Sequence, residues 1–186
     1  TMCTFLGTAG KISKNDLDVG AIKKSDLIFL EGYLWDEGDP KEAFEQAINL
    51  SNKTAMSLSD KFCVDRHKSN FLNLVKNKLD LVFANEAEVM ALIDAKNFNE
   101  VISFGKEIKK HLIITRGDKG AVSIYNGEIQ EIDAKKDLKI VDLTGAGDLF
   151  ASGYLHGFIN NFSQQECLTK ATDMSSKIIQ QIGARF

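Results

Sequence analysis

The stretch LVFANEAE, residues 81–88, joins a short apolar run directly to a helix-forming segment. Four apolar residues closed by polar ones are typical of a buried strand. The same alternation recurs along the chain, with strands expected at residues 26–30, 54–58 and 112–115 and helices at Asp39-Pro40 to about 50, 64–79 and 98–110. Strands that alternate with helices predict a doubly wound α/β fold, in which helices cover both faces of a mostly parallel sheet.

The pattern changes towards the C-terminus. Residues 121–125 and 128–134 are expected to form a hairpin, because Asn126-Gly127 is a strong turn signal between them. A strand end at 139–142 and helices at 146–160 and 163–181 follow. Residues 1–7 have the pattern of a strand already under way. We therefore interpret residues 1–186 as one continuous domain whose N-terminal part is absent.

Composition excludes several classes of function. The formal charge of −3 gives no electrostatic reason to expect nucleic-acid binding. No apolar run approaches the length of a membrane span. The scattered cysteines Cys3, Cys63 and Cys167 favour reduced thiols over a disulfide framework or a zinc site. We therefore expect a cytoplasmic protein that binds neither nucleic acid nor membrane.

The segment DLTGAGD, residues 142–148, is the strongest chemical signal. It consists of a strand end, a turn of small residues and the first turn of a helix. Gly145 and Gly147 leave room for backbone N–H groups to converge on an anion at the positive helix end. Asp148 beside them could accept a proton from an attacking hydroxyl. The structural alternative is a glycine-rich helix start, with Asp148 interacting only with the helix dipole.

Two further turns carry polar residues with a double interpretation. Asn85 and Glu88 follow a predicted strand at its carboxyl end, where α/β folds bind ligands, but the same pair also suits a helix cap. Residues 115–121, TRGDKGA, form a tight connection between two strands. Arg116 could pair with phosphate oxygens, whereas Lys119 has the default interpretation of a solvated turn charge.

Taken together, these segments resemble the ribokinase-like (PfkB) family of carbohydrate and nucleoside kinases, in its adenosine-kinase-like branch. The resemblance implies a three-layer α/β/α sandwich and ATP-dependent transfer of a phosphoryl group to a sugar or nucleoside hydroxyl. It implies Asp148 as the catalytic base, with Gly145, Ala146 and Gly147 as the anion hole. The remaining implied roles are nucleotide binding by Thr115, Arg116, Gly117, Gly120 and Gly183, magnesium binding through water by Asn85 and Glu88, and binding of a monovalent cation such as K⁺ by Asp142 and Thr144.

The resemblance covers only the C-terminal, nucleotide-binding portion of the family. Family members carry a preceding stretch with a di-glycine sugar-contact motif and a β-sheet lid, and nothing in residues 1–26 resembles either. A homodimer of the kind implied by the family would form through that lid. A nucleotide-binding module without catalysis stays open as an alternative. A dinucleotide-dependent oxidoreductase is disfavoured, because its glycine fingerprint follows an early strand.

Overall fold

A computed structural model describes residues 5, 7–35 and 40–186. The chain forms two compact units, residues 1–101 and 102–186. The strand expected at residues 1–7 lies largely outside the described residues, and so does the cap expected at Asp39. The interpretation of the chain as one domain stays a prediction.

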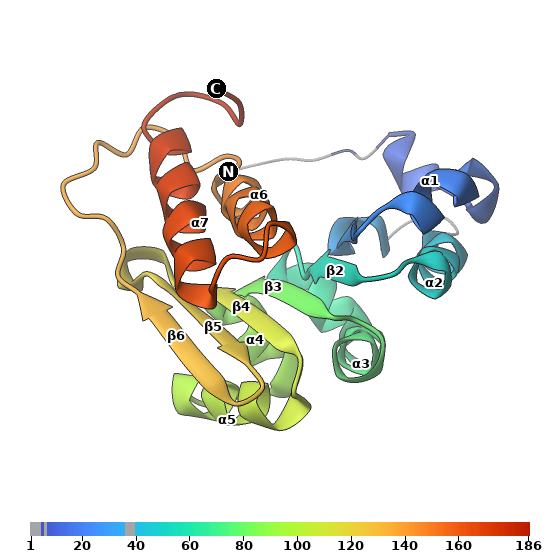
Figure 1. Ribbon diagram of the computed structural model, residues 1–186, viewed down its shortest axis with the longest axis horizontal. Coiled ribbons are helices and arrows are strands. Elements are labelled where there is room, and N and C mark those ends of the chain that lie inside the picture. The colour runs from blue at the N-terminus through green and yellow to red at the C-terminus, as the bar shows by residue number, and fades with distance from the viewer. Residues whose placement is uncertain (1–4, 6, 36–39) are drawn as a thin grey trace. The chain divides into compact units, whose positions relative to one another are not determined.

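The first unit contains a parallel three-stranded arrangement, as the alternating pattern predicted (Figure 1). Its register pairs Ile28 with Thr54 and Ala55 with Leu81. Its regular elements are α1 (Val19–Lys24), β1 (Ile28–Glu31), α2 (Pro40–Leu50), β2 (Thr54–Ser57), α3 (Lys61–Asn77), β3 (Leu81–Asn85) and α4 (Glu86–Ile93). Three short 3₁₀ helices, Ala9–Lys11, Lys14–Asp16 and Gly32–Trp35, precede or follow them.

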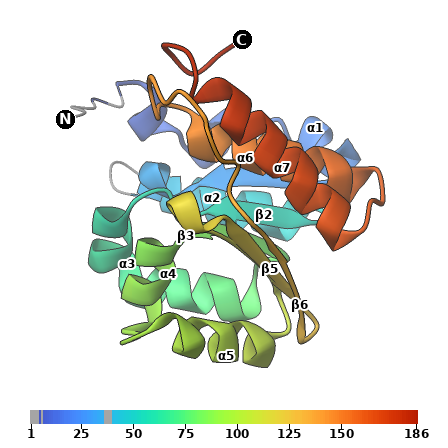
Figure 2. The ribbon, with the colours of Figure 1, turned by 90° about the vertical axis from the view of Figure 1, so that its left-hand side faces the viewer.

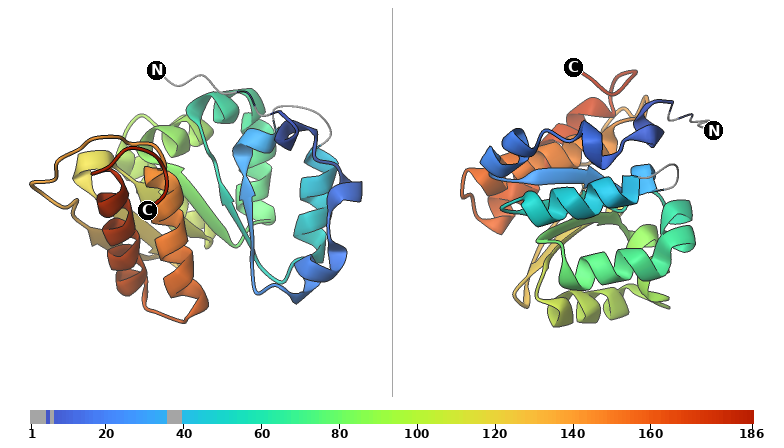
Figure 3. Two further views of the ribbon diagram at one scale, coloured as in Figure 1. Left: turned by 90° about the horizontal axis from the view of Figure 1, so that it is seen from above. Right: turned by 90° about the vertical axis from the view of Figure 1, so that its right-hand side faces the viewer.

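Aromatic and aliphatic side chains form the core of the first unit. Trp35 packs edge-on against Phe44 of α2 and Phe71 of α3, with ring centroids 5.4 and 5.9 Å apart. Met56 and Val82 of the neighbouring strands are fully buried. Figure 3 shows α2 alongside β1, with which it is in contact. The apolar faces of these helices therefore cover the strands.

The second unit is antiparallel. After α5 (Phe98–Ile108), strand β4 (His111–Thr115) pairs with β5 (Ala121–Tyr125), and β5 pairs with β6 (Glu128–Ile132). Two long helices follow, α6 (Ala146–Ile159) and α7 (Gln164–Ile178). Figures 1 and 2 show α6 and α7 side by side on one face of these strands and α5 on the other.

Most boundaries agree with the sequence pattern, but two do not. Helix α3 begins at Lys61, earlier than predicted, because the Asp60 carboxylate accepts a hydrogen bond from the Phe62 amide and caps the helix. The strand end predicted at 139–142 was wrong, since this segment is irregular. Its amides at Val141 and Asp142 donate to the Ile179 carbonyl, so no neighbouring strand pairs with it. In the described part of the chain, no helix combines the length and apolar character needed to cross a membrane.

Candidate active site

A glycine with a left-handed backbone begins α6. Gly145 is the N-cap residue, with φ +80°, and no side chain caps this helix. A Cβ atom at this position would lie 2.7 Å from the Cβ and 2.9 Å from the Cα of Ala184. The C-terminal segment therefore packs directly on the turn, and only glycine provides both the conformation and the space.

Asp142 ties this turn to the C-terminal segment. Its Oδ1 accepts hydrogen bonds from the amide and hydroxyl of Thr144, at 2.9 and 2.7 Å, and its Oδ2 accepts one from the amide of Gly183 at 2.9 Å. The Gly183 and Thr144 donors hold the pKa of Asp142 below its ordinary value. Four of the residues singled out from the sequence thus lie together: Asp142, Thr144, Gly145 and Gly183.

The first turn of α6 offers amides and a carboxylate to solvent. The Ala146 amide donates to the Leu143 carbonyl at 3.1 Å, so it is already used within the turn. The next two amides, of Gly147 and Asp148, belong to the helix start and have no acceptor within the helix. Gly147 and Asp148 are both exposed, and no atom lies within 4 Å of a Cβ placed on Gly147. This end of α6 can accept an anion, with the Asp148 carboxylate at its side.

The turn after β4 contains a second pair of glycines with positive φ. Gly117 has φ +61° with open space around it, whereas Gly120 has φ +86° and packs against the backbone of Ile132 and Asp133. The Arg116 amide donates to the Gly120 carbonyl at 2.8 Å and closes the turn. Gly120 therefore has a structural reason to be glycine, while Thr115, Arg116 and Gly117 border the more exposed side.

Asn85 and Glu88 form a capping box at the start of α4, in which Asn85 is exposed and Glu88 is buried. The Glu88 carboxylate accepts from the Asn85 amide at 2.9 Å and from its side-chain Nδ2 at 2.5 Å, and the Glu88 amide donates to Asn85 Oδ1 at 2.9 Å. Glu88 is only 4% exposed, and burial raises its pKa to about 7 despite the hydrogen bond from Asn85. Asn85 and Glu88 therefore form the helix cap that was one of the two interpretations of this motif.

Two carboxylates near Glu88 escaped the sequence analysis. Asp60 and Glu31 both raise the pKa of Glu88 by charge repulsion, and they follow or end β2 and β1. Their signal was available, because the carboxyl ends of parallel strands meet at one sheet edge. A cation would relieve this repulsion, which suits Mg²⁺ and its oxygen ligands. The described residues contain no cluster of three or more His, Cys, Asp or Glu positioned to hold a metal directly.

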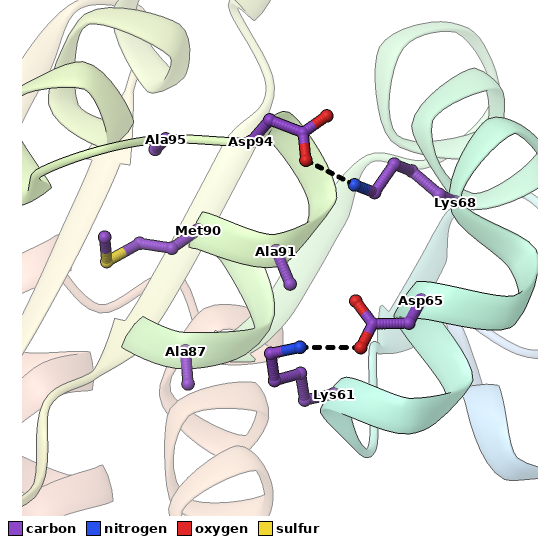
Figure 4. Close-up of a pocket in the computed structure, with 8 residues that line it drawn as sticks. All are labelled: Lys61, Asp65, Lys68, Ala87, Met90, Ala91, Asp94 and Ala95. Carbon is purple, nitrogen blue, oxygen red and sulfur yellow. Dashed lines mark hydrogen bonds and ion pairs between the residues drawn. The ribbon is translucent and has the colours of Figure 1, made fainter.

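A surface hollow of about 490 Å³ lies elsewhere in the first unit, between α3 and α4 (Figure 4). Its charged rim consists of two ion pairs, Lys61 with Asp65 and Lys68 with Asp94, each at 2.6 Å. Its floor is formed by alanines and Met90. None of the residues singled out from the sequence lines it, and its charges are already paired, so it is a weaker candidate than the start of α6.

The fold and the uncapped helix start place the chain among α/β proteins equipped to bind an anion at a helix N-terminus. Residues 1–186 match the profile described as "pfkB family carbohydrate kinase". The chain belongs to this family of kinases. The resemblance seen in the sequence is confirmed.

Solved structures and curated relatives agree with this assignment. A probable sugar kinase from Rhizobium etli is 34% identical with a TM-score of 0.90, over 94% of this chain and 54% of that one. An adenosine kinase from Sinorhizobium meliloti is 33% identical with a TM-score of 0.91, over 95% of this chain and 55% of that one. A cytidine kinase from Thermococcus kodakarensis is 31% identical over 62% of this chain and 42% of its own length. The expected fold is confirmed, and the chain spans about half the length of these proteins.

Proposed function

We propose that this chain is the nucleotide-binding and phosphate-binding portion of a kinase that transfers the γ-phosphoryl group of ATP to a hydroxyl of a sugar or nucleoside. The observation that carries the proposal is the start of α6. An exposed carboxylate, Asp148, stands beside free first-turn amides in a helix that no side chain caps. A base beside an anion-binding helix end is what phosphoryl transfer to an alcohol requires.

The chemistry assigns one task to each group at this turn. Asp148 accepts the proton of the acceptor hydroxyl. The hydroxyl oxygen of the acceptor forms the new bond to the γ-phosphorus, and the bond from that phosphorus to the departing ADP oxygen breaks. The amides of Gly147 and Asp148 stabilise negative charge on the transferred phosphoryl group. Gly145 and Ala146 shape the turn, because the Ala146 amide is used by Leu143. Their role in the anion hole is to hold the next amides in place.

The other site residues have supporting roles in this proposal. Thr115, Arg116 and Gly117 border the nucleotide, with Gly120 fixing their turn and Gly183 closing the opposite side. Asn85 and Glu88 hold hydrated Mg²⁺, which supplies neutralisation of phosphate charge when bound. Asp142 and Thr144 border the proposed monovalent cation. Because three of the hydrogen-bond sites on Asp142 are taken by Thr144 and Gly183, its contribution is limited to the remaining lone pair.

The acceptor is proposed only as a class. Two of the relatives are named adenosine kinase and cytidine kinase, and another is named as a probable sugar kinase. Nucleosides are therefore the first acceptors to screen, followed by ribose and fructose. The cytoplasmic location and a homodimer built through a lid stay predictions.

The deciding experiment replaces Asp148 by Asn. In a phosphotransfer assay with the acceptor found in that screen, Asp148→Asn should lower kcat by about 10²–10⁴-fold, since the proton acceptor is lost. Because Asp148 is exposed, the unfolding temperature should stay near that of the wild type. Asp173→Asn is the matched control: it changes an exposed helical aspartate of the same unit that pairs with Lys135, and kcat should not change. Wild-type turnover in Asp148→Asn would remove Asp148 as the base.

A second candidate is nucleotide binding without phosphoryl transfer. It is compatible with the anion-binding start of α6, which could bind a nucleotide phosphate whether or not Asp148 acts as a base. Titration with ATP separates the two functions. If the chain binds ATP equally well with and without Asp148→Asn and turns over no acceptor in the screen, the binding role is the better description.

A further inference from the structure

A buried polar cluster joins four elements of the second unit. His111 of β4, Ser123 of β5 and Tyr154 of α6 form a triangle of hydrogen-bonding atoms. The distances are 2.9 Å from His111 Nε2 to Ser123 Oγ, 2.7 Å from Ser123 Oγ to the Tyr154 hydroxyl, and 2.6 Å from that hydroxyl to His111 Nε2. Ser123 also donates to Gln164 Oε1 at the start of α7, at 2.8 Å. Kinase chemistry uses none of these groups directly.

One arrangement of hydrogens gives every donor in the cluster its own acceptor. Ser123 donates to Gln164, so the Tyr154 hydroxyl donates to Ser123, and His111 Nε2–H donates to Tyr154. This order requires the His111 tautomer that carries its hydrogen on Nε2. The opposite tautomer would place an N–H on Nδ1, which is buried and has no partner in the described part of the chain. An unpaired buried N–H is costly. We therefore infer the Nε2–H tautomer, in which Nδ1 is instead an acceptor without a partner in the described part of the chain.

The same geometry opposes a second proton on His111. Its ring stacks on Tyr125 at a centroid distance of 4.8 Å and meets Phe158 edge-on at 5.8 Å. The titratable groups facing the cluster are the phenols of Tyr125 and Tyr154 and the Cys167 thiol of α7, which faces Tyr154. Burial lowers the pKa of His111 to about 4. His111 is therefore neutral at physiological pH, with its tautomer set by Tyr154.

The hydrogen bonds of Tyr154 to His111 and Ser123 connect α6 to β4 and β5. On another side of the helix, Gly153 and Gly157 pack against α7, where a Cβ at Gly153 would lie 2.8 Å from the Ala171 Cα and one at Gly157 2.9 Å from the Cys167 sulfur. These contacts hold α6 close to α7, whereas the hydrogen bonds of Tyr154 fix its distance and direction relative to β4 and β5. Asp148 lies six residues before Tyr154, about 9 Å along the helix axis. A shift of Tyr154 therefore moves the first turn of α6.

We propose that His111, Ser123 and Tyr154 are positioning residues, whose hydrogen-bonded chain sets the placement of α6, and hence of Asp148 and the first-turn amides, against β4 and β5. The inference rests on the proposed kinase function for its catalytic consequence. Its structural consequence, a fixed first turn of α6, can be measured without any substrate.

The main test is Tyr154→Phe with Tyr125→Phe as its matched control. Both changes remove one phenol oxygen next to His111, but only Tyr154 belongs to the hydrogen-bonded chain. Tyr154→Phe should lower kcat by about 10-fold to 100-fold, the scale expected for a misplacement of about 1 Å, with the KM for ATP changed less than about 3-fold, a limit well below that loss. Hydrogen exchange in a peptide covering residues 142–152 should become faster. Tyr125→Phe should leave kcat and exchange unchanged.

A second pair of variants tests the neutral histidine. The glutamine side chain of a His111→Gln variant offers an N–H near the Nε2 position but cannot titrate, so it should restore most of the activity that His111→Leu loses. Below pH 6.5 the wild type should lose exchange protection at residues 142–152. As the pH falls, His111 takes up a proton more readily in the unfolded chain than in the folded one, and this lowers the stability of the fold. The His111→Gln variant should not show this loss.

The outcomes separate this inference from the proposed function. If the wild type transfers no phosphoryl group in the acceptor screen, the kinase proposal fails, and hydrogen exchange still decides whether the cluster holds α6. Unchanged exchange and kcat in Tyr154→Phe would overturn the positioning role. An equal loss in Tyr125→Phe would also overturn it, because the effect would then come from general packing around His111.

Discussion

Helices α4 and α6 begin in opposite ways. At α4 two amides are satisfied by side chains, because Asn85 and Glu88 cap each other's backbone. At α6 no side chain caps the helix, Gly145 provides only the turn, and Asp148 stays exposed. The start of α4 is closed by a capping box with a buried carboxylate, while no side chain caps the start of α6.

The difference separates a motif whose side chains cap their own helix from one whose amides and carboxylate are left to solvent. Burial raises the pKa of Glu88 to about 7, so the box at α4 holds its carboxylate at an electrostatic cost. That cost favours a cation beside it. The start of α6 has positive helix-dipole character and unused amides, so it favours an anion. The two motifs therefore suit metal and phosphate respectively, on physical grounds that are independent of the family resemblance.

The sharpest way to break this comparison is to add a methyl group at each glycine of the open start. Gly145→Ala should destabilise the protein by roughly 2–4 kcal/mol, since alanine is strained at positive φ and its methyl would collide with Ala184. Gly147→Ala should unfold at or above the wild-type temperature, because its methyl enters open space and alanine favours helix by about 1 kcal/mol. Thermal unfolding measures both.

Kinase activity should distinguish Gly147→Ala from the wild type even though its stability does not. If the space around Gly147 receives the phosphate, Gly147→Ala should lose kinase activity by about 10-fold or more while its fold stays intact. A stable Gly147→Ala variant with full activity would place the anion elsewhere. A stable Gly145→Ala variant would show that the C-terminal segment does not pack on the turn.

The buried carboxylate gives a pH dependence with a defined sign. The folded-state pKa of Glu88, about 7, lies above its ordinary value of 4.5, so the folded chain keeps a proton that the unfolded chain has lost. The contribution of Glu88 to the free energy of unfolding should therefore fall as pH rises from about 4.5 to about 7, by about 2–3 kcal/mol, and stay level above that range. His111 contributes an opposite slope between about pH 4 and 6.5. The contribution of Glu88 is therefore measured as the difference in the free energy of unfolding between the wild type and Glu88→Gln at each pH, obtained by denaturant unfolding.

Added Mg²⁺ extends the same measurement. A cation near Glu88 should lower its pKa and reduce the slope. If Glu88→Gln keeps the wild-type slope, another group titrates and the buried box is not its source. If Mg²⁺ has no effect on the slope, the metal does not act at Glu88.

Periodicity predicted most of the fold because strands and helices here are short and clearly patterned. The runs at 81–84 and 112–115 became buried strands, and Asn126-Gly127 became the predicted hairpin turn. The segment at 139–142 failed, because apolar residues such as Ile140 and Val141 indicate a strand only when a neighbouring strand is present to pair with them. Here both are exposed, and the Val141 amide donates to the Ile179 carbonyl.

The candidate site was predictable as motifs but not as contacts. The sequence indicated Asp142 and Gly183 separately, and only the structure shows the hydrogen bond between residues so distant in the chain. Asp60 was missed because a helix cap and a ligand look alike in sequence. The chain from His111 through Tyr154 could not be foreseen, since it depends on side chains from three elements meeting in one place.

The smallest expected effect compares two caps with the same contacts and different burial. Asn97 and Glu100 at the start of α5 repeat two of the bonds of Asn85 and Glu88, but in an exposed position. Asn85→Ala should cost about 1–2 kcal/mol, because the buried Glu88 carboxylate loses a donor. Asn97→Ala should cost about 0.5 kcal/mol, since water replaces the lost donor. Chemical denaturation measures both free energies.

The loss of unfolding free energy in Asn85→Ala, compared with that in Asn97→Ala, measures the effect of burial. The pKa of Glu88 should rise further in Asn85→Ala, because a hydrogen bond that favours its ionised form is gone, whereas Glu100 in Asn97→Ala stays in contact with water. If the two variants lose the same free energy, Glu88 is hydrated in solution and the α4 start is as open as that of α6. A larger loss at Asn85 means that α4 begins as a closed, preformed cap, so any ligand in the first unit must bind around the box rather than displace it.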